Sequence, residues 1–466
     1  MFNSTRLVLS TLLFLAVPAA AAAQEHEGHP APPDTAAQEE RPAEPAPDHA
    51  DHAPAQGGHG MAPGVLGEAR SREGSGTAWL PDASPMYALH SQAGGWETML
   101  HGSVFLQYVA EGGDRGDDQL GATSWLMGMA RRPWAGGALT LRAMGSLDPA
   151  TVGECGYPDL LATGETCEGG RPIHDRQHPH DAIMELGALY ERALSPGTAF
   201  QLYGALAGEP ALGPVAYPHR ISAMALPLAP ITHHWLDATH IAFGVATAGV
   251  YSARWKVEAS VFNGREPDEE RWDLDLAALD SWSGRLAILP SERWALQVST
   301  GRLAEAEVGH GPGDERVDVE RTTASAIHHR PRPDGGVWAT TLAWGRNVED
   351  GEATYAILLE SSLNLGERQV AFARVEAAEK SAEDLALDEA LHGRMFRVGK
   401  VVAGYVRRWG PVAGWNPGIG GGVSIGLVPE DLEPFYGGRA PVGAFVYLTL
   451  RPASMGAGGT EEGGAR

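Results

Sequence analysis

The sequence predicts an all-β protein, a transmembrane antiparallel β-barrel of about 16 strands (about 14 to 18) with long outer loops and a disordered N-terminal tail. Three observations predict this class. An export leader opens the chain, apolar and polar residues alternate over most of its length, and short and long connections alternate between these segments. After the leader, no segment approaches the roughly 20 apolar residues that a membrane-spanning helix needs.

The first element is the leader MFNSTRLVLSTLLFLAVPAAAAAQ. It has one basic residue at Arg6, an apolar run from Leu7 to Val17, and small residues that end at Ala23. This order is typical of a secretory signal peptide, so residues 1–23 are expected to be removed during export.

Residues 24–75 form the second element, a segment dominated by proline, alanine and acidic residues. It has too little apolar surface to offset the entropy of ordering the chain, so it is expected to be disordered. Its imidazoles and nearby carboxylates suit loose capture of copper or zinc, and the alternative is a solvated linker without a ligand. The tail histidines are His26, His29, His49, His52 and His59.

The body of the chain follows as a series of alternating segments. In YSARWKVEASVF, Trp255 and Val257 fall on one face while Lys256 and Glu258 fall on the other. Charged residues on the inner face do not suit a dry core, but they suit a water-filled lumen whose outer face meets lipid. The expected strands lie near 97–109, 120–131, 136–147, 181–194, 198–207, 238–249, 251–263, 281–289, 292–303, 319–330, 336–346, 352–364, 367–378, 394–408, 414–427 and 440–451.

The connections give an independent test of the barrel. RPWAG, SPG, the Tyr251 turn, PSE, RPRPDG, NLGE and WGPV are short. The connections between them, from AEGGDRGDDQ to RNVEDG and VPEDLEPFYGG, are expected to be longer loops. Short turns at one end and long loops at the other are typical of transmembrane barrels.

Over about residues 90–451 the chain resembles a bacterial outer-membrane β-barrel protein of the porin type. The segments HDRQHPHD, GEPALGP and HHWLDATHI are also similar to an uncharacterised family of exported bacterial proteins. The resemblance implies an outer-membrane location. An even number of strands returns both termini to the periplasm, so segment 24–75 is expected there. The polar segment 452–466, expected to be a flexible C-terminal tail, departs from barrels of this class, which usually end on an aromatic residue. The resemblance also implies outer-membrane lipid and the barrel-assembly machinery as partners, and a monomer or homotrimer.

The expected function is a passive channel for small hydrophilic solutes or ions, which needs no enzymatic chemistry. Two alternatives stay open: a metal-dependent enzyme at the barrel mouth, and a structural or adhesive barrel plugged by its own loops. Charged side chains on the inner face are the expected pore-lining residues: Arg254, Lys256, Glu258, Glu360, Arg374 and Glu376.

A histidine constellation is expected at the outer mouth, where two long loops flank neighbouring strands. Three or four imidazole or carboxylate ligands are needed to hold one metal ion, and this set could supply them for copper or zinc. The alternatives are hydrogen-bonded packing of the loops within the lumen, and acid-base chemistry. The candidate ligands are His174, His178, His180, Asp181, His219, His233, His234, Asp237 and His240.

The two cysteines, Cys155 and Cys167, lie in one glycine-rich loop and are expected to form a disulfide in an oxidising compartment. The acidic loop NGREPDEERWDLDLAALD is interpreted as solvated rather than as a calcium site, because it lacks the expected ligand pattern. A formal net charge of −24, spread over the chain, makes nucleic acid an unsuitable partner.

Overall fold

The computed structural model describes residues 61–153, 155–167, 171–308 and 316–454. The chain divides into two units, Met1–His59 and Gly60–Arg466, and all described residues belong to the second. The expected signal peptide, the five tail histidines and residues 455–466 of the expected C-terminal tail lie outside the described part. Within that part, no helix has the length and apolar character required to cross a membrane.

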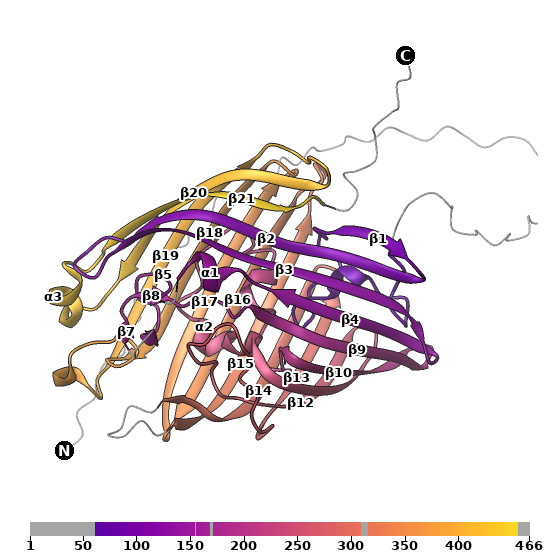
Figure 1. Ribbon diagram of the computed structural model, residues 1–466, viewed down its shortest axis with the longest axis horizontal. Coiled ribbons are helices and arrows are strands. Elements are labelled where there is room, and N and C mark those ends of the chain that lie inside the picture. The colour runs from indigo at the N-terminus through magenta and orange to yellow at the C-terminus, as the bar shows by residue number, and fades with distance from the viewer. Residues whose placement is uncertain (1–60, 154, 168–170, 309–315, 455–466) are drawn as a thin grey trace, which may run out of the picture. The chain divides into compact units, whose positions relative to one another are not determined.

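Sixteen antiparallel strands pair edge to edge into a closed ring in the described part of the chain (Figure 1). The ring closes where β2 pairs with β21, with Val104 opposite Leu450. The strands of the ring are β2 (Trp96–Ala110), β3 (Asp118–Trp134), β4 (Gly137–Gly145), β9 (Ile183–Ser195), β10 (Thr198–Gly208), β11 (Ala242–Tyr251), β12 (Trp255–Phe262), β13 (Ser281–Ser291), β14 (Trp294–Val308), β15 (Arg316–Pro331), β16 (Val337–Glu349), β17 (Glu352–Leu365), β18 (Gln369–Ser381), β19 (Met395–Arg408), β20 (Trp415–Leu427) and β21 (Val442–Pro452).

Short elements accompany the ring. The strand β1 (Leu89–Ala93) pairs with the first part of β2 and lies outside the closed circuit. The loop between β4 and β9 contains two small hairpin pairings, β5 with β8 and β6 with β7. The remaining elements are η1 (Arg70–Arg72), α1 (Asp148–Thr151), β5 (Tyr157–Pro158), β6 (Glu165–Cys167), β7 (Arg171–Ile173), β8 (Arg176–Gln177), η3 (Tyr217–His219), α2 (His233–Leu236), η4 (Ala238–His240), η5 (Glu389–Leu391), η6 (Glu430–Leu432) and α3 (Glu433–Tyr436).

The predicted fold class, a sixteen-strand antiparallel barrel, is confirmed, and each ring strand overlaps one of the predicted segments. One predicted loop is wrong. RNVEDG was expected to be a long connection, but β16 ends at Glu349 and β17 begins at Glu352, which leaves only Asp350 and Gly351 between them. Both residues have positive φ, at 49° and 86°, as a tight two-residue hairpin turn requires.

The outer face of the ring is apolar. Along β12, Trp255, Val257 and Val261 are exposed, while Lys256 and Glu258 between them are buried inside. At the ends of the strands joined by short turns, exposed tryptophans form a girdle of the kind that lies at a membrane interface. These tryptophans are Trp134, Trp255, Trp294, Trp338 and Trp409. An apolar band bordered by such a girdle suits contact with lipid.

The lumen is filled by the loop between β10 and β11, residues 209–241, which we call the plug. Nearly every plug residue is buried, and so are the inward-facing side chains of the strands around it. In Figure 1, α2 lies within the ring, where it contacts β15, β16 and β17. Gly345 of β16 makes this contact possible, because a side chain there would lie 2.3 Å from the carbonyl oxygen of Trp235.

Buried ion pairs hold the plug to the barrel wall. The Arg220 guanidinium contacts Glu360 of β17 and Asp237 of the plug, each at 2.6 Å. Arg374 of β18 donates to the Leu228 carbonyl oxygen at 2.9 Å and lies 3.3 Å from Glu360. These contacts place a chain of alternating charges between plug and wall, shielded from water.

Residues 70–80 also enter the lumen and meet the plug. Ser75 accepts a hydrogen bond from the Ala216 amide at 2.8 Å, and the Thr77 hydroxyl accepts one from Arg285 at 3.0 Å. The expected end of the disordered segment at residue 75 is therefore wrong, because Arg70, Arg72 and Ser75 are already buried. Composition misses this because the polar side chains of residues 70–77 find partners in the lumen, and only the last residues, among them Ala78 and Leu80, pack in an apolar cluster.

Candidate functional site at the barrel mouth

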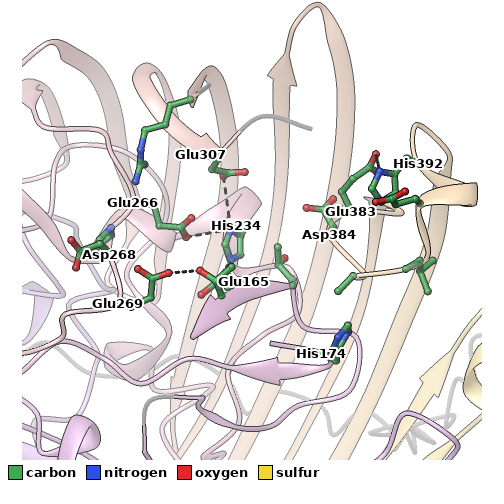
Figure 2. Close-up of a pocket in the computed structure, with 18 of the residues that line it drawn as sticks. Glu165, His174, His234, Glu266, Asp268, Glu269, Glu307, Glu383, Asp384 and His392 are labelled. Carbon is green, nitrogen blue, oxygen red and sulfur yellow. Dashed lines mark hydrogen bonds and ion pairs between the residues drawn. The ribbon is translucent and has the colours of Figure 1, made fainter. Parts of the chain in front are cut away.

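A cavity of about 820 Å³ opens at the end of the barrel where the long loops lie (Figure 2). Four further cavities hold only about 20 to 70 Å³ each. Among the residues that line the large cavity, the arginines are Arg271 and Arg316. The carboxylates that line it are Glu165, Glu266, Asp268, Glu269, Glu307, Glu383, Asp384 and Glu389. The mouth therefore presents a strongly acidic vestibule above the plug.

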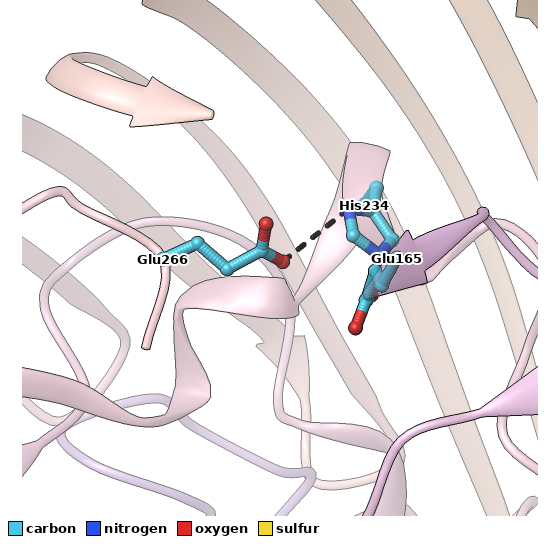
Figure 3. A group of neighbouring side chains, drawn as sticks. All are labelled: Glu165, His234 and Glu266. Atoms are coloured by element: carbon cyan, nitrogen blue, oxygen red, sulfur yellow. Dashed lines mark hydrogen bonds and ion pairs between the residues drawn. The ribbon is translucent and has the colours of Figure 1, made fainter. Parts of the chain in front are cut away.

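His234 lies at the floor of this vestibule, at the start of α2 (Figures 2 and 3). Its Nε2 donates to Glu165 Oε1 at 3.2 Å. Its Nδ1 lies 3.7 Å from Glu266 Oε1 and 3.8 Å from Glu307 Oε1, and it is buried without a hydrogen-bond partner. One imidazole is thus surrounded by three carboxylates.

Each member of this group, which we call the His234 cluster (Glu165, His234, Glu266 and Glu307), comes from a different element. Glu165 begins β6, Glu266 lies in the loop between β12 and β13, and Glu307 is near the end of β14. The Glu266 amide donates to the Ala306 carbonyl oxygen at 2.9 Å, which fixes Glu266 beside Glu307. The Asn347 side chain donates to the His234 carbonyl oxygen at 3.1 Å and so fixes α2.

Burial and mutual proximity shift the ionisation of these groups. Burial, together with Glu165 and Glu307, raises the pKa of Glu266 to about 8, although His234 acts against this shift. Burial alone would raise the pKa of Glu165, but His178 and His234 outweigh it and hold that pKa well below its usual range. Burial would lower the pKa of His234, but Glu266, Glu165 and Glu307 raise it well above its usual value. The cluster therefore holds positive charge on the imidazole among crowded carboxylates.

The histidines of HDRQHPHD separate rather than converge. His174 is exposed at the vestibule, and His178 Nδ1 pairs with Glu165. Burial lowers the pKa of His178 to about 4, with Glu165 opposing the shift. His180 donates from Nδ1 to Asp148 at 2.9 Å and accepts from the Tyr217 hydroxyl at 3.1 Å. His178 and His180 therefore have different partners and do not face one another as two ligands of one ion would.

The second group of histidines packs within the plug. His233 donates to Asp237 at 2.8 Å, and His240 donates to the Asp237 carbonyl oxygen at 2.9 Å. Ring contacts link His180, His233 and His240, with ring centroids 5.0 and 5.4 Å apart. These hydrogen bonds match loop packing, which was the alternative to metal binding.

Two further candidates lie apart from both groups. Asp181 is 3.5 Å from Arg271, and the His219 ring packs on Trp125 with centroids 4.5 Å apart. Of the nine loop residues proposed as ligands, only His234 belongs to a group of three or more ligand atoms that lie within 4.8 Å in the described part of the chain.

The expected pore-lining residues lie on the inner wall, with one exception. Lys256, Glu258, Glu360, Arg374 and Glu376 are buried against the plug or residues 70–80. Arg254 is exposed in the turn between β11 and β12. The alternating pattern in the sequence begins one residue before β12, so the prediction that Arg254 lines the lumen is wrong.

A disulfide joins Cys155 to Cys167 in the loop that carries Glu165. The disulfide lowers the conformational entropy of the loop when it unfolds, by an amount that grows with the logarithm of loop length. We expect reduction, or the variant Cys155→Ala, to make residues 146–182 several-fold more sensitive to protease while the barrel strands stay resistant. Limited proteolysis with mass spectrometry tests this, and an unchanged cleavage rate in that loop would contradict it.

Sequence reasoning missed three of the four cluster residues. Glu165, Glu266 and Glu307 were each part of an acidic stretch with no metal-ligand spacing, and they are about 40 to 140 residues apart in the chain. Their only local signal is the acidic character of three long loops expected at the same end of the barrel.

No protein-family model and no curated protein matches this sequence. Similar solved structures include a Salmonella typhi OmpF complex with daunomycin (10% identity, 78% of this chain and 100% of that chain, TM-score 0.45). A second is an anion-selective porin from Comamonas acidovorans, with 11% identity over 77% of this chain and 99% of that chain and a TM-score of 0.43. A third is Pseudomonas putida OprB at high pH, with 9% identity over 77% of this chain and 94% of that chain and a TM-score of 0.46. At these values the similarity assigns no function. The strand pairing and the apolar outer face show that the described part of the chain forms a closed antiparallel β-barrel.

Proposed function

We propose that the protein is an outer-membrane channel for small hydrophilic solutes or ions, which its own plug holds in a closed state. One observation carries this proposal: charged side chains of the inner wall, among them Glu360, Arg374 and Glu376, are buried under the plug. An open lumen would leave these side chains in water, so the conformation described is an occluded one.

The chemistry of the plug contact favours a channel over a permanently sealed barrel. Buried ion pairs contribute little net stability compared with apolar packing, because each charge loses its hydration. When the plug withdraws, groups such as Arg220, Glu360 and Arg374 regain water on both surfaces. The plug also packs on apolar side chains of the wall, as Leu226 and Leu228 do beside Phe372. Withdrawal of the plug exposes this apolar area to water, so the open state is expected to be rare.

The vestibule gives the proposed channel a charge preference. Among the described residues, eight carboxyl groups line it against two guanidinium groups and the positively charged His234, so negative charge predominates and the local potential concentrates cations and repels anions. We therefore propose that cations or neutral solutes enter more readily than anions.

The proposal also sets the orientation and the partners. The short turns and the N-terminal tail lie in the periplasm, the vestibule faces outward, and lipid covers the apolar band. The barrel-assembly machinery inserts the chain, which then acts as a monomer or a homotrimer without enzymatic chemistry. Cross-linking in membranes distinguishes the two assembly states.

Flux into liposomes tests the channel. We expect wild-type protein to pass potassium slowly but faster than empty liposomes, and Glu360→Gln to raise this rate several-fold, because the plug loses a charge partner. Glu352→Gln, an exposed glutamate at the start of the same strand, is the matched control and should leave the rate unchanged.

A third variant separates a channel from a plugged structural barrel. Replacing residues 214–236 with a short glycine-serine linker should give fast flux in either case. If only this variant conducts, while wild type and Glu360→Gln match empty liposomes, the channel proposal is contradicted and the structural or adhesive barrel is supported.

A further inference from the structure

We propose that the His234 cluster binds one divalent transition-metal ion, with His234, Glu266 and Glu307 as ligands and Glu165 as the residue that positions the imidazole. This site differs from the histidine set that the sequence suggested. It also goes beyond the proposed channel, because the ion can bind whether or not the barrel conducts.

The His234 ring is oriented by a hydrogen bond from one of its two nitrogens. Its Nε2 already donates to Glu165, so the other ring nitrogen, Nδ1, is the one left to bind an ion. Nδ1 is buried and has no hydrogen-bond partner, and carboxylate oxygens of Glu266 and Glu307 lie 3.7 and 3.8 Å from it. These distances are too long for hydrogen bonds. Ligand atoms of Glu165, His234 and Glu266 lie within 4.8 Å of one another, whereas Glu307 lies outside this group and would move toward a bound ion.

The carboxylate behind the imidazole supports this orientation. A metal-binding histidine usually donates its other N–H to a carboxylate or carbonyl, which fixes the ring orientation and makes the ligand more basic. Glu165 occupies that place, and its second oxygen pairs with His178 Nδ1. His178 therefore holds Glu165 in place, and Glu165 in turn orients the His234 ring.

The ligating carboxylates are also held in place. The hydrogen bond from the Glu266 amide to Ala306 joins its loop to β14 directly beside Glu307. His234 is 6% exposed, so its ring is shielded from bulk water. The positive charge of the His234 imidazole offsets the repulsion between Glu266 and Glu307, and a divalent cation that displaces the Nδ1 proton would take over this role.

The donor set selects the class of ion. One imidazole nitrogen and carboxylate oxygens, without sulfur, suit Zn²⁺, Mn²⁺ or Co²⁺ rather than Cu⁺, which prefers thiolate and thioether ligands. Three protein ligands leave a further position open toward the cavity of about 820 Å³. The site is therefore accessible to an ion that arrives from the vestibule.

Zn²⁺ binding to the folded full-length mature chain tests the site. To remove competing imidazoles, the five tail histidines are replaced by alanine in every protein compared. We expect one Zn²⁺ per chain in competition with a chromophoric chelator, and a Co²⁺ complex with visible absorption bands at the same stoichiometry. His234→Gln and Glu266→Gln should each lose this ion, and Glu307→Gln should weaken it at least tenfold.

Two further variants make the test specific. Glu165→Gln keeps an oxygen that can accept from Nε2, so it should weaken binding by roughly 10- to 100-fold without abolishing it. His392→Ala removes an exposed histidine from the same vestibule and should change nothing. If the chain without tail histidines binds no ion, or if its His234→Gln variant retains the ion with unchanged affinity, the site is rejected even where the liposomes conduct.

Discussion

Replacing Arg220 with alanine is expected to release the plug from the barrel wall. The guanidinium is fully buried and contacts Glu360, Asp237 and the Val215 carbonyl oxygen. Its loss leaves buried carboxylates with fewer counter-charges, a change that costs about 3–5 kcal/mol in comparable sites. Since about 1.4 kcal/mol corresponds to a factor of ten, amide exchange in residues 209–241 should accelerate at least a hundredfold.

Hydrogen-exchange mass spectrometry on the folded protein in micelles measures this effect. The strands of the ring should keep their protection, because their hydrogen bonds do not involve Arg220. Arg254→Ala removes an exposed arginine from a turn and serves as the control. Unchanged exchange in the plug of Arg220→Ala would show that the ion pairs do not hold it.

A charge on the lipid-facing surface is expected to have the second large effect. Leu359 points outward from the middle of β17 and is 46% exposed. An arginine near the bilayer midplane costs about 2–4 kcal/mol, because its charge loses hydration in the hydrocarbon. Leu359→Arg should therefore lower the free energy of unfolding of the barrel in phospholipid vesicles by about this amount, which is measured as a lower denaturant midpoint.

Leu276→Arg provides the matched control for this prediction. Leu276 is 56% exposed, but it lies in the loop between β12 and β13, outside the strands. An arginine there stays in water and should leave the midpoint unchanged. Equal effects of the two variants would contradict the assignment of the outer face of β17 to lipid.

The strands were predictable because their signal is local. The face on which Val257 or Glu258 lies can be predicted from the adjacent residues, since side chains alternate between the two faces of a strand. The same rule fails at strand ends, since Arg254 was predicted in the lumen but lies in an exposed turn. It also fails in turns, since RNVEDG was predicted as a long loop but has only two residues outside the strands. Pairing geometry, rather than alternation, decides those positions.

The candidate site was only partly predictable because it depends on where loops meet. His234 was identified from its neighbours in HHWLDATH, but its partners Glu165, Glu266 and Glu307 come from three separate segments. No spacing in sequence encodes their approach. The role of Arg220 was missed for the same reason, since its partner Glu360 is 140 residues away.

Residues 70–80 show a different limit. Their sequence, RSREGSGTAWL, has the polar and glycine-rich composition of a linker, yet Arg72 and Thr77 are buried in the lumen. A polar segment can be ordered when a polar cavity supplies its hydrogen bonds, and composition alone does not report that cavity.

Single-channel conductance in planar bilayers tests the central claim, that the plug closes the lumen, most directly. The account predicts that wild-type protein is mostly closed with brief openings, and that Arg220→Ala stays open longer at a conductance approaching that of the chain lacking residues 214–236. Steady wild-type steps as large as those of the shortened chain would contradict it, because they would place the plug outside the conducting path.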